Sequence, residues 1–142
     1  MTTLVIDTGQ DIVGIFSVEE KQYIPYRGDA ILFAIHRIET ADEVVTYNGN
    51  NRDLEDMGKF AGVSGDLPLK GVHIDIRSIC WSDRIWGSDL SSTYFKHFKV
   101  CRSFPDTYEG SNERDVYMTF KLWELWKQGN IKILDGQILD NQ

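Results

Sequence analysis

The sequence predicts a single α/β domain with a mixed β-sheet flanked by helices. The chain has 142 residues, which is close to the usual size of one domain. Its hydrophobic share of 42% is sufficient to build one core. Three closely spaced apolar runs open the chain, and short apolar runs then alternate with segments of helical periodicity. We therefore predict that residues 1–142 form one domain, in which antiparallel strands precede parallel ones.

The first part of the chain predicts three antiparallel strands. Residues 4–6 and 12–18 are rich in β-branched side chains, and only a short polar segment with a glycine separates them. Residues 22–26 follow a polar turn and predict the third strand. Pro25 favours an edge position for that strand, because proline has no backbone N–H to donate.

Helices and strands alternate through the rest of the chain. A helix is predicted over residues 29–39, with Asp29 as its cap and an apolar face. That face consists of Ile31, Leu32, Ile35 and Ile38. Further strands are predicted over residues 43–47 and 72–76, and further helices over residues 53–61, 90–98 and 112–128. The helix over 53–61 is expected to turn Leu54, Met57 and Phe60 inward.

The last predicted helix carries a long apolar stripe, so we expect much of it to be buried. The stripe consists of Val116, Phe120, Trp123 and Trp126. Asn112 is the expected cap, which places Asp115 in the first turn, and Gly129 is expected to end the helix. One more strand is expected in the tail, residues 131–142, whose polar end should fray.

Charge and composition exclude several classes of function. The 22 acidic and 15 basic residues give a net charge of −7, the wrong sign for holding long nucleic acid by charge alone. No apolar run approaches the roughly 20 residues that cross a bilayer, and the N-terminus lacks the pattern of a secretion signal. Cys80 and Cys101 do not make a disulfide framework. We therefore expect a cytoplasmic protein with no membrane partner.

Several familiar catalytic or binding patterns are absent from the sequence. The three histidines are far apart and no Cys-x-x-Cys occurs, which argues against zinc. Neither a dinucleotide-binding loop, nor a phosphate-binding Walker loop, nor a Gly-x-Ser-x-Gly elbow is present. Trp123 and Trp126 are predicted core residues, whereas Trp81 and Trp86 are candidates for base stacking or for a partner surface.

Three aspartates stand at the ends of predicted elements. Asp7 ends the first strand, Asp53 follows the fourth strand and opens a helix, and Asp115 opens the last helix. Acids at such positions can converge at one edge of an α/β sheet. Three converging carboxylates repel one another unless a cation such as Mg²⁺ or Mn²⁺ neutralises them. Alternatively, Asp7 is a turn residue, and Asp53 and Asp115 complement helix N-termini.

The spacing of motifs around these aspartates resembles a known family. Residues 44–54, VVTYNGNNRDL, resemble the second motif of the DEDD or DnaQ-like 3′–5′ exonuclease superfamily, with Asn48, Gly49 and Asp53 at matching places. Residues 4–9, LVIDTG, resemble its first motif, an apolar strand ending in an aspartate. Asp115 at the start of the last helix resembles the third motif. The resemblance covers nearly the whole chain.

This resemblance implies an RNase H-like sheet and a metal-dependent nuclease. Asp7, Asp53 and Asp115 are then the catalytic metal ligands of a two-metal site for Mg²⁺ or Mn²⁺. Asn48, Gly49 and Thr8 are the implied substrate-binding residues. The implied substrates are 3′ ends of single-stranded DNA or RNA. Neither the choice between DNA and RNA nor an oligomeric state follows from the sequence.

Three positions depart from the family pattern. Gly9 stands where the family has a second acid, and Arg52 replaces an aromatic residue. Gly110 or Ser111, according to subtype, stands where the general base is expected. We therefore expect reduced activity or, alternatively, a catalytically degenerate RNase H-like module that serves as a binding or scaffold protein. A third interpretation is an unrelated α/β domain whose acids are only turns and caps.

Overall fold

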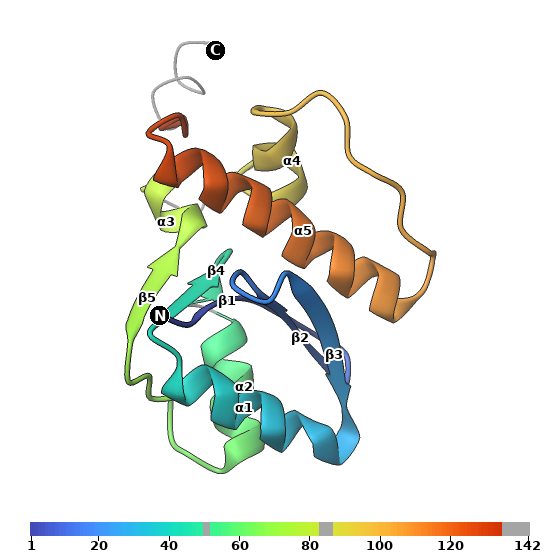
Figure 1. The fold of residues 1–142 in the computed structure, drawn as a ribbon, viewed down its shortest axis with the longest axis vertical. Coiled ribbons are helices and arrows are strands. Elements are labelled where there is room, and N and C mark those ends of the chain that lie inside the picture. Colours follow the sequence, from blue (N-terminus) through green and yellow to red (C-terminus); the bar gives the residue numbers. More distant parts are fainter. Residues whose placement is uncertain (50–51, 83–86, 135–142) are drawn as a thin grey trace.

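The computed structural model describes residues 1–49, 52–82 and 87–134, and it confirms the predicted α/β class. A mixed sheet of five strands, in the order β3-β2-β1-β4-β5, lies between two layers of helices (Figure 1). The strands are β1 (Thr3–Gly9), β2 (Ile12–Ser17), β3 (Gln22–Arg27), β4 (Glu43–Thr46) and β5 (Val72–Asp75). The helices are α1 (Ile31–Thr40), α2 (Asp53–Ala61), α3 (Ile76–Cys80), α4 (Leu90–Phe95) and α5 (Tyr108–Lys127).

The strand directions agree with the predicted order of antiparallel and then parallel pairing. β1 pairs antiparallel with β2, and β2 pairs antiparallel with β3. β4 and β5 extend the sheet in parallel on the other side of β1. β3 is an edge strand, as Pro25 predicted. The arrangement is compatible with an RNase H-like sheet.

The alternation of side chains along β1 divides the core into two halves. Leu4 and Ile6 point to one face and pack in the core formed with α1 and α2. Val5 points to the other face and packs in the core formed with α5. Figure 1 shows α1 and α2 on one side of the sheet and α5, with α3 and α4 beside it, on the other. The odd-numbered residues of β1, including Asp7, therefore face α5.

The start and the buried face of α1 differ from the prediction. Asp29 is not a cap, because it lies in a short 3₁₀ helix, Gly28–Ala30, that precedes α1. Ala30 is the N-cap and makes no side-chain cap bond. Leu32 is 54% exposed, and Ala34 is buried with the three isoleucines. The reason is rotational, since positions i, i+3, i+4 and i+7 of a helix share one face and i+1 does not. Phe60 of α2 is likewise exposed rather than inward.

The last helix begins earlier than predicted, at Tyr108. Thr107 is its cap, and the Thr107 side chain accepts a hydrogen bond of 2.9 Å from the backbone N–H of Gly110. The prediction that Asn112 caps the helix was therefore wrong, and Asp115 lies about two turns inside the helix rather than in its first turn. Gly129, with a φ of 77°, follows the end of the helix as predicted.

The remaining predictions concern β5, the tail and the tryptophans. Residue 76 begins α3 rather than ending β5. Residues 131–134 form no strand, and residues 83–86, which include Trp86, and 135–142 lie outside the described part.

Trp81 is fully buried and donates a hydrogen bond of 2.9 Å to Thr93, so it is a core residue rather than a stacking surface. Trp123 and Trp126 pack against the α5-side core, as predicted.

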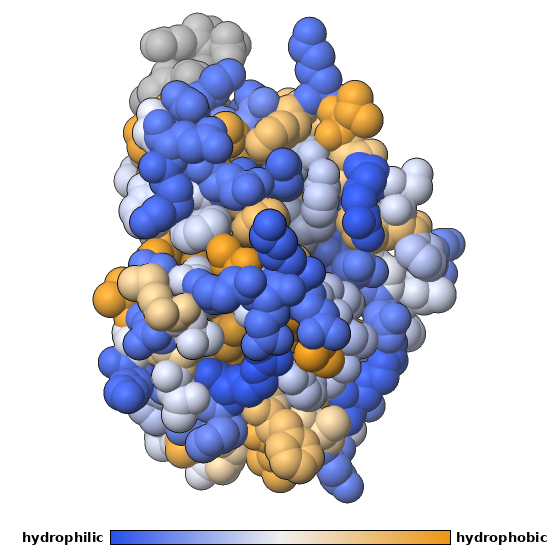
Figure 2. Space-filling view, viewed as in Figure 1, coloured by the Kyte–Doolittle hydropathy of each residue, from blue (hydrophilic) through white to orange (hydrophobic). Residues whose placement is uncertain are grey.

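No helix in the described ranges is both long enough and apolar enough to cross a membrane. The face shown in Figure 2 is largely hydrophilic, and its hydrophobic side chains lie in small, separate areas.

Candidate functional site

The structure gathers Asp7, Asp53 and Asp115 into one acidic cluster between β1, α2 and α5. Asp7 is near the end of β1 on the face that α5 covers, and Asp115 lies on α5. Asp53 is the first residue of α2. Burial raises the pKa of Asp7 well above its usual value, and the charges of Asp53 and Asp115 raise it further. The three aspartates predicted from the sequence to converge therefore do affect one another electrostatically.

A guanidinium group lies within this cluster. Nη2 of Arg52 is 2.9 Å from Oδ1 of Asp7, and Nε of Arg52 is 3.2 Å from Oδ1 of Asp53. Burial alone lowers the pKa of Arg52, but the charges of the two aspartates outweigh it and raise the pKa. Arg52 therefore stays charged and links two acids that belong to different elements. Sequence reasoning identified Arg52 only as a departure from the family pattern, because nothing local indicates where its side chain reaches.

Asp53 is the most deeply buried member of the cluster, with an exposed fraction of 0%. Its Oδ1 accepts a hydrogen bond of 2.6 Å from the hydroxyl of Thr8. Its Oδ2 is buried and has no hydrogen-bond partner among the described residues. Burial raises the pKa of Asp53, and the hydrogen bond from Thr8 opposes that rise. An unpartnered buried carboxylate oxygen is a free acceptor that a cation can use.

Asn112 positions Asp7 from the α5 side. Its Nδ2 donates to the backbone oxygen of Asp7 at 3.0 Å, and its Oδ1 accepts from the hydroxyl of Tyr23 at 2.6 Å. The amide packs directly over Gly14, where an added Cβ would lie 1.8 Å from Oδ1 of Asn112. Asn112 stands three residues before Asp115, on the same face of α5. That spacing could have indicated from the sequence that Asn112 and Asp115 belong to one site, but Asn112 was interpreted as a helix cap instead.

Asp115 completes the cluster on its more open side. Burial raises the pKa of Asp115, and the nearby guanidinium of Arg114, 3.4 Å from Oδ1, opposes the rise. Because Asp7 and Asp115 both have raised pKa values, this part of the cluster retains protons to higher pH than ordinary aspartates do.

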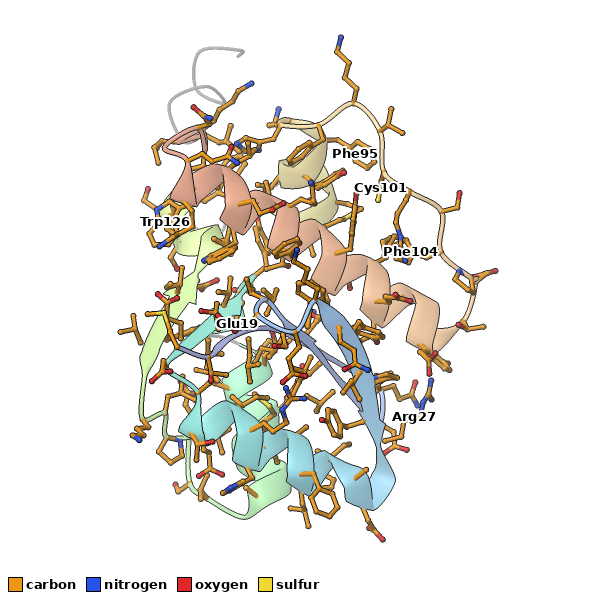
Figure 3. All side chains as sticks on the ribbon, in the orientation of Figure 1. Glu19, Arg27, Phe95, Cys101, Phe104 and Trp126 are labelled. Atoms are coloured by element: carbon orange, nitrogen blue, oxygen red, sulfur yellow. The ribbon has the colours of Figure 1, made fainter. Side chains whose placement is uncertain are left out.

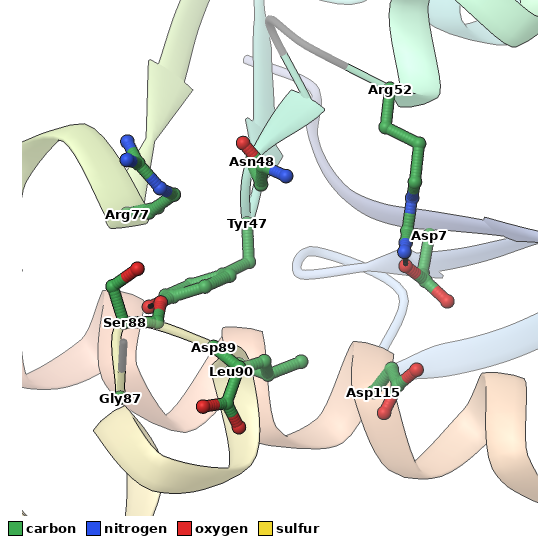
Figure 4. Close-up of a pocket in the computed structure, with 10 residues that line it drawn as sticks. All are labelled: Asp7, Tyr47, Asn48, Arg52, Arg77, Gly87, Ser88, Asp89, Leu90 and Asp115. Carbon is green, nitrogen blue, oxygen red and sulfur yellow. Dashed lines mark hydrogen bonds and ion pairs between the residues drawn. The ribbon is translucent and has the colours of Figure 1, made fainter. Parts of the chain in front are cut away.

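A cavity of about 350 Å³ opens beside Asp7 and Asp115. In Figure 4 these two aspartates lie on one side of the cavity, and Arg77 and Ser88 lie on the other. Its lining residues are Asp7, Tyr47, Asn48, Arg52, Arg77, Gly87, Ser88, Asp89, Leu90 and Asp115. The lining is mostly polar and includes carboxylates, guanidinium groups and hydroxyls, so it suits a polar ligand.

The three predicted substrate-binding residues lie in different places. Asn48 lines the cavity, in a left-handed conformation with a φ of 69°, and its backbone N–H donates to Asp75 at 2.6 Å. Gly49 does not line the cavity and packs against the side chain of Thr46, which leaves no room for a Cβ. Thr8 is also outside the cavity, since its hydroxyl is directed to Asp53. Thr8 thus positions a carboxylate.

The positions where the resemblance places a general base, Gly110 or Ser111, do not face the cavity, and neither do the neighbouring Tyr108 and Glu109. Gly110 packs beneath Pro105, whose carbonyl oxygen would lie 2.0 Å from an added Cβ. Ser111 and Tyr108 are exposed, and Glu109 pairs with Arg27 at 3.4 Å. None of these residues is among those that line the cavity.

Tyr47 lines the cavity, but its hydroxyl is buried and bonded to other residues. It donates to the backbone oxygen of Ser88 and lies 2.6 Å from the hydroxyl of Thr93. Burial raises the pKa of Tyr47, so this hydroxyl stays protonated and does not serve as a general base.

The cluster suits a hard divalent cation in its chemistry, although its side chains are arranged around Arg52. The donors are three carboxylates, one of which has a buried oxygen without a partner, and carboxylate oxygens are the ligands that Mg²⁺ and Mn²⁺ prefer. Within the described ranges, no three His, Cys, Asp or Glu side chains are already arranged to hold a metal ion. The fold and the site therefore define an α/β domain with an acidic cluster bridged by an arginine. No protein-family model matches the chain, and no curated protein matches it at a significant level.

Proposed function

We propose that this protein is a divalent-metal-dependent phosphodiester hydrolase of the 3′–5′ exonuclease type, with reduced activity, acting on ends of single-stranded nucleic acid. One observation carries the proposal. Three aspartates from distant parts of the chain gather beside a polar cavity, and one of them, Asp53, has a buried oxygen without a hydrogen-bond partner among the described residues. Burial raises the pKa of all three aspartates, and the charges of Asp53 and Asp115 raise that of Asp7 further; such a cluster is costly for folding, which is typical of functional sites rather than of turns and caps.

Each side chain of the cluster has a distinct task in this proposal. Asp7, Asp53 and Asp115 would hold Mg²⁺ or Mn²⁺, which when bound activates a water molecule and stabilises the leaving oxygen. Asn112 holds the backbone of Asp7, and Thr8 holds the carboxylate of Asp53.

The cavity and the surface charge suggest what the protein acts on. The volume of about 350 Å³ is at the small end of ligand pockets, as expected for one terminal nucleotide. Asn48 and Ser88 offer polar contacts in its wall. The net charge of −7 disfavours holding long nucleic acid by charge alone, so the proposed substrate is a short single-stranded end. A cytoplasmic location, where such ends occur, belongs to the same proposal.

A second candidate function is a catalytically degenerate module that binds a partner or serves as a scaffold. Two observations favour it. The guanidinium of Arg52 already pairs with Asp7 and Asp53. None of the expected base positions faces the cavity, and Gly110 has no room for any side chain. In this alternative the acidic cluster is a structural ion-pair network.

Cleavage of labelled oligonucleotides separates the two candidates. Purified protein is incubated with 5′-labelled single-stranded DNA and RNA in the presence of Mn²⁺, and the products are resolved by length. We expect a ladder shortened from the 3′ end that is lost in Asp7→Asn and Asp115→Asn. Asp29→Asn is the matched control, because Asp29 is an exposed aspartate outside the cluster. Absence of products, or the same products from Asp7→Asn, contradicts the nuclease proposal.

A further inference from the structure

We propose that the side of the cavity opposite Asp7 and Asp115 is an anion site, at which the guanidinium of Arg77 binds a phosphate group. That group belongs to a small phosphate ester or to the backbone of a nucleic-acid strand. The inference goes beyond the proposed function, because it requires neither a bound metal ion nor cleavage. It gives a role to a charged side chain that the acidic cluster does not use.

Arg77 is a nearly buried charge that has no partner in the described part of the chain. It lies in α3, lines the cavity and is only 6% exposed. Its guanidinium makes no hydrogen bond or ion pair with any described residue. A guanidinium carries five N–H donors and stays charged, and burying such a group without a partner is costly. An arginine in this situation at a cavity wall indicates that a ligand supplies the missing acceptor.

The carboxylates closest to Arg77 in the chain or in the cavity wall are bonded to other groups. Asp75 accepts a hydrogen bond of 2.6 Å from the backbone N–H of Asn48 and one of 3.1 Å from the hydroxyl of Ser78. Asp89 lines the same cavity, but its carboxylate caps α4 by accepting a hydrogen bond of 3.1 Å from a backbone N–H. Neither aspartate forms an ion pair with Arg77 in the described structure, so the protein itself does not neutralise this charge.

Ser88 adds a hydroxyl to the same side of the cavity. It lines the cavity, is 8% exposed, and its hydroxyl has no hydrogen-bond partner among the described residues. In Figure 4 this hydroxyl points toward Arg77. Burial raises the pKa of Tyr47, and the charge of Arg77 opposes that rise, which places the charge near the Tyr47 hydroxyl that bonds Ser88. A guanidinium and a hydroxyl from two different elements suit a group with several acceptor oxygens, such as a phosphate.

The acids on the other side of the cavity are paired with cations of their own. Asp7 pairs with Arg52 at 2.9 Å, and Asp115 pairs with Arg114 at 3.4 Å. These pairs reduce the repulsion that the two carboxylates would exert on an anion beside Arg77. The cavity of about 350 Å³ has room for a phosphate group and for part of the molecule that carries it.

Titration of the metal-free protein with inorganic phosphate tests the inference without measuring cleavage. The protein is labelled with the heavy nitrogen isotope and followed by NMR at constant ionic strength. We expect the side-chain Nε–H signal of Arg77 and the backbone N–H signal of Ser88 to shift until they saturate. Arg77→Met should weaken phosphate binding by at least about tenfold, because hydrogen bonds to a charged group are strong. Ser88→Ala should weaken it by about two- to tenfold, as for a neutral hydrogen bond.

Thermal unfolding without phosphate separates a ligand-binding arginine from a structural one. Arg77→Met removes a buried charge that has no partner, so its melting temperature should equal or exceed that of the wild type. A structural arginine would lower the melting temperature when it is removed. A clear decrease, or a failure of Arg77→Met to fold, therefore contradicts the inference.

Arg27→Met is the matched control, because it changes the net charge by the same amount. Arg27, labelled in Figure 3, pairs with Glu109 at 3.4 Å and is not among the residues that line the cavity. We expect this variant to bind phosphate as the wild type does. An equal loss of binding in Arg27→Met and Arg77→Met would mean that only the net charge matters, which contradicts a site at Arg77.

Methyl phosphate and dimethyl phosphate distinguish the two sources of the group. Saturable binding of dimethyl phosphate supports the site and assigns it to the phosphodiester of a strand. Binding of methyl phosphate alone supports the site and assigns it to a terminal phosphate ester. No saturable shift with any of the three phosphates, or shifts that leave Arg77 and Ser88 unaffected, contradicts the inference. Cleavage of oligonucleotides is measured separately, so a failure of the nuclease proposal does not alter these results.

Discussion

Replacing Asn112 with alanine tests whether the α5 side of the site is held together as the structure indicates. Asn112 is almost fully buried and connects three elements, because it joins Asp7 of β1 and Tyr23 of β3 to α5. The substitution removes these two hydrogen bonds, together with a longer one of 3.4 Å from Nδ2 to Oδ2 of Asp7, and leaves open space over Gly14. Alanine has the higher helix propensity, so the helix itself is not weakened.

The expected loss of stability follows from the two hydrogen bonds. The backbone oxygen of Asp7 loses a donor at 3.0 Å in a buried place, and leaving such a group without a partner costs about 1–3 kcal/mol. The hydroxyl of Tyr23 loses an acceptor at 2.6 Å but is only half-buried, so water can replace much of that bond at a cost of about 0.5–1 kcal/mol. Together these give a decrease of about 1.5–4 kcal/mol in the free energy of unfolding.

Urea unfolding at pH 7, followed by tryptophan fluorescence, measures this decrease. Tyr23→Phe is the companion variant and should lose about 0.5–1 kcal/mol, and the double variant should show a coupling energy of about 1 kcal/mol. The slope of free energy against urea should not change, since the surface exposed on unfolding is the same. A loss below about 0.5 kcal/mol for Asn112→Ala, or additive single losses, contradicts the inferred positioning of Asp7.

Two further predictions concern pH and the position expected for a base. The folded pKa of Asp7 is raised, so its stabilising contribution is fully present below the unfolded value of 3.8 and is lost as pH rises through the folded pKa. Asp7→Asn should therefore raise the melting temperature of the metal-free protein by a few degrees at pH 7 and by much less at pH 3.5. Scanning calorimetry measures both shifts, and equal shifts at the two pH values contradict the raised pKa of Asp7. Gly110→Ala should lower stability by about 1–3 kcal/mol, because its Cβ meets the carbonyl of Pro105. Ser111→Ala, on the same helix, is the control and should change stability by less than about 0.5 kcal/mol. Equal effects of the two variants in urea unfolding contradict the close contact between Gly110 and the carbonyl of Pro105.

Local patterns were enough to predict the strands and most helices, because local side-chain chemistry determines them. The bounds of α2 were predicted at both ends, since polar residues precede Asp53 and Gly62 follows the helix in a left-handed conformation. The start of α5 was missed, because Thr107 and Asn112 are both good caps and only the packing of the preceding segment favours Thr107. Leu32 was placed inward for a similar reason, since the rotation of α1 depends on where the 3₁₀ turn ends.

The sequence by itself predicted the fold class, and it offered the convergence of Asp7, Asp53 and Asp115 as one of two interpretations, because the ends of sheet strands and the helices that follow them can meet at one edge. Only the tertiary structure decided what neutralises those acids. The reach of Arg52 to two carboxylates and of Asn112 to β1 depends on distances between elements that are far apart in the chain. Side-chain partners across such gaps leave no periodic signal, because periodicity reports the neighbours of a residue within its own element.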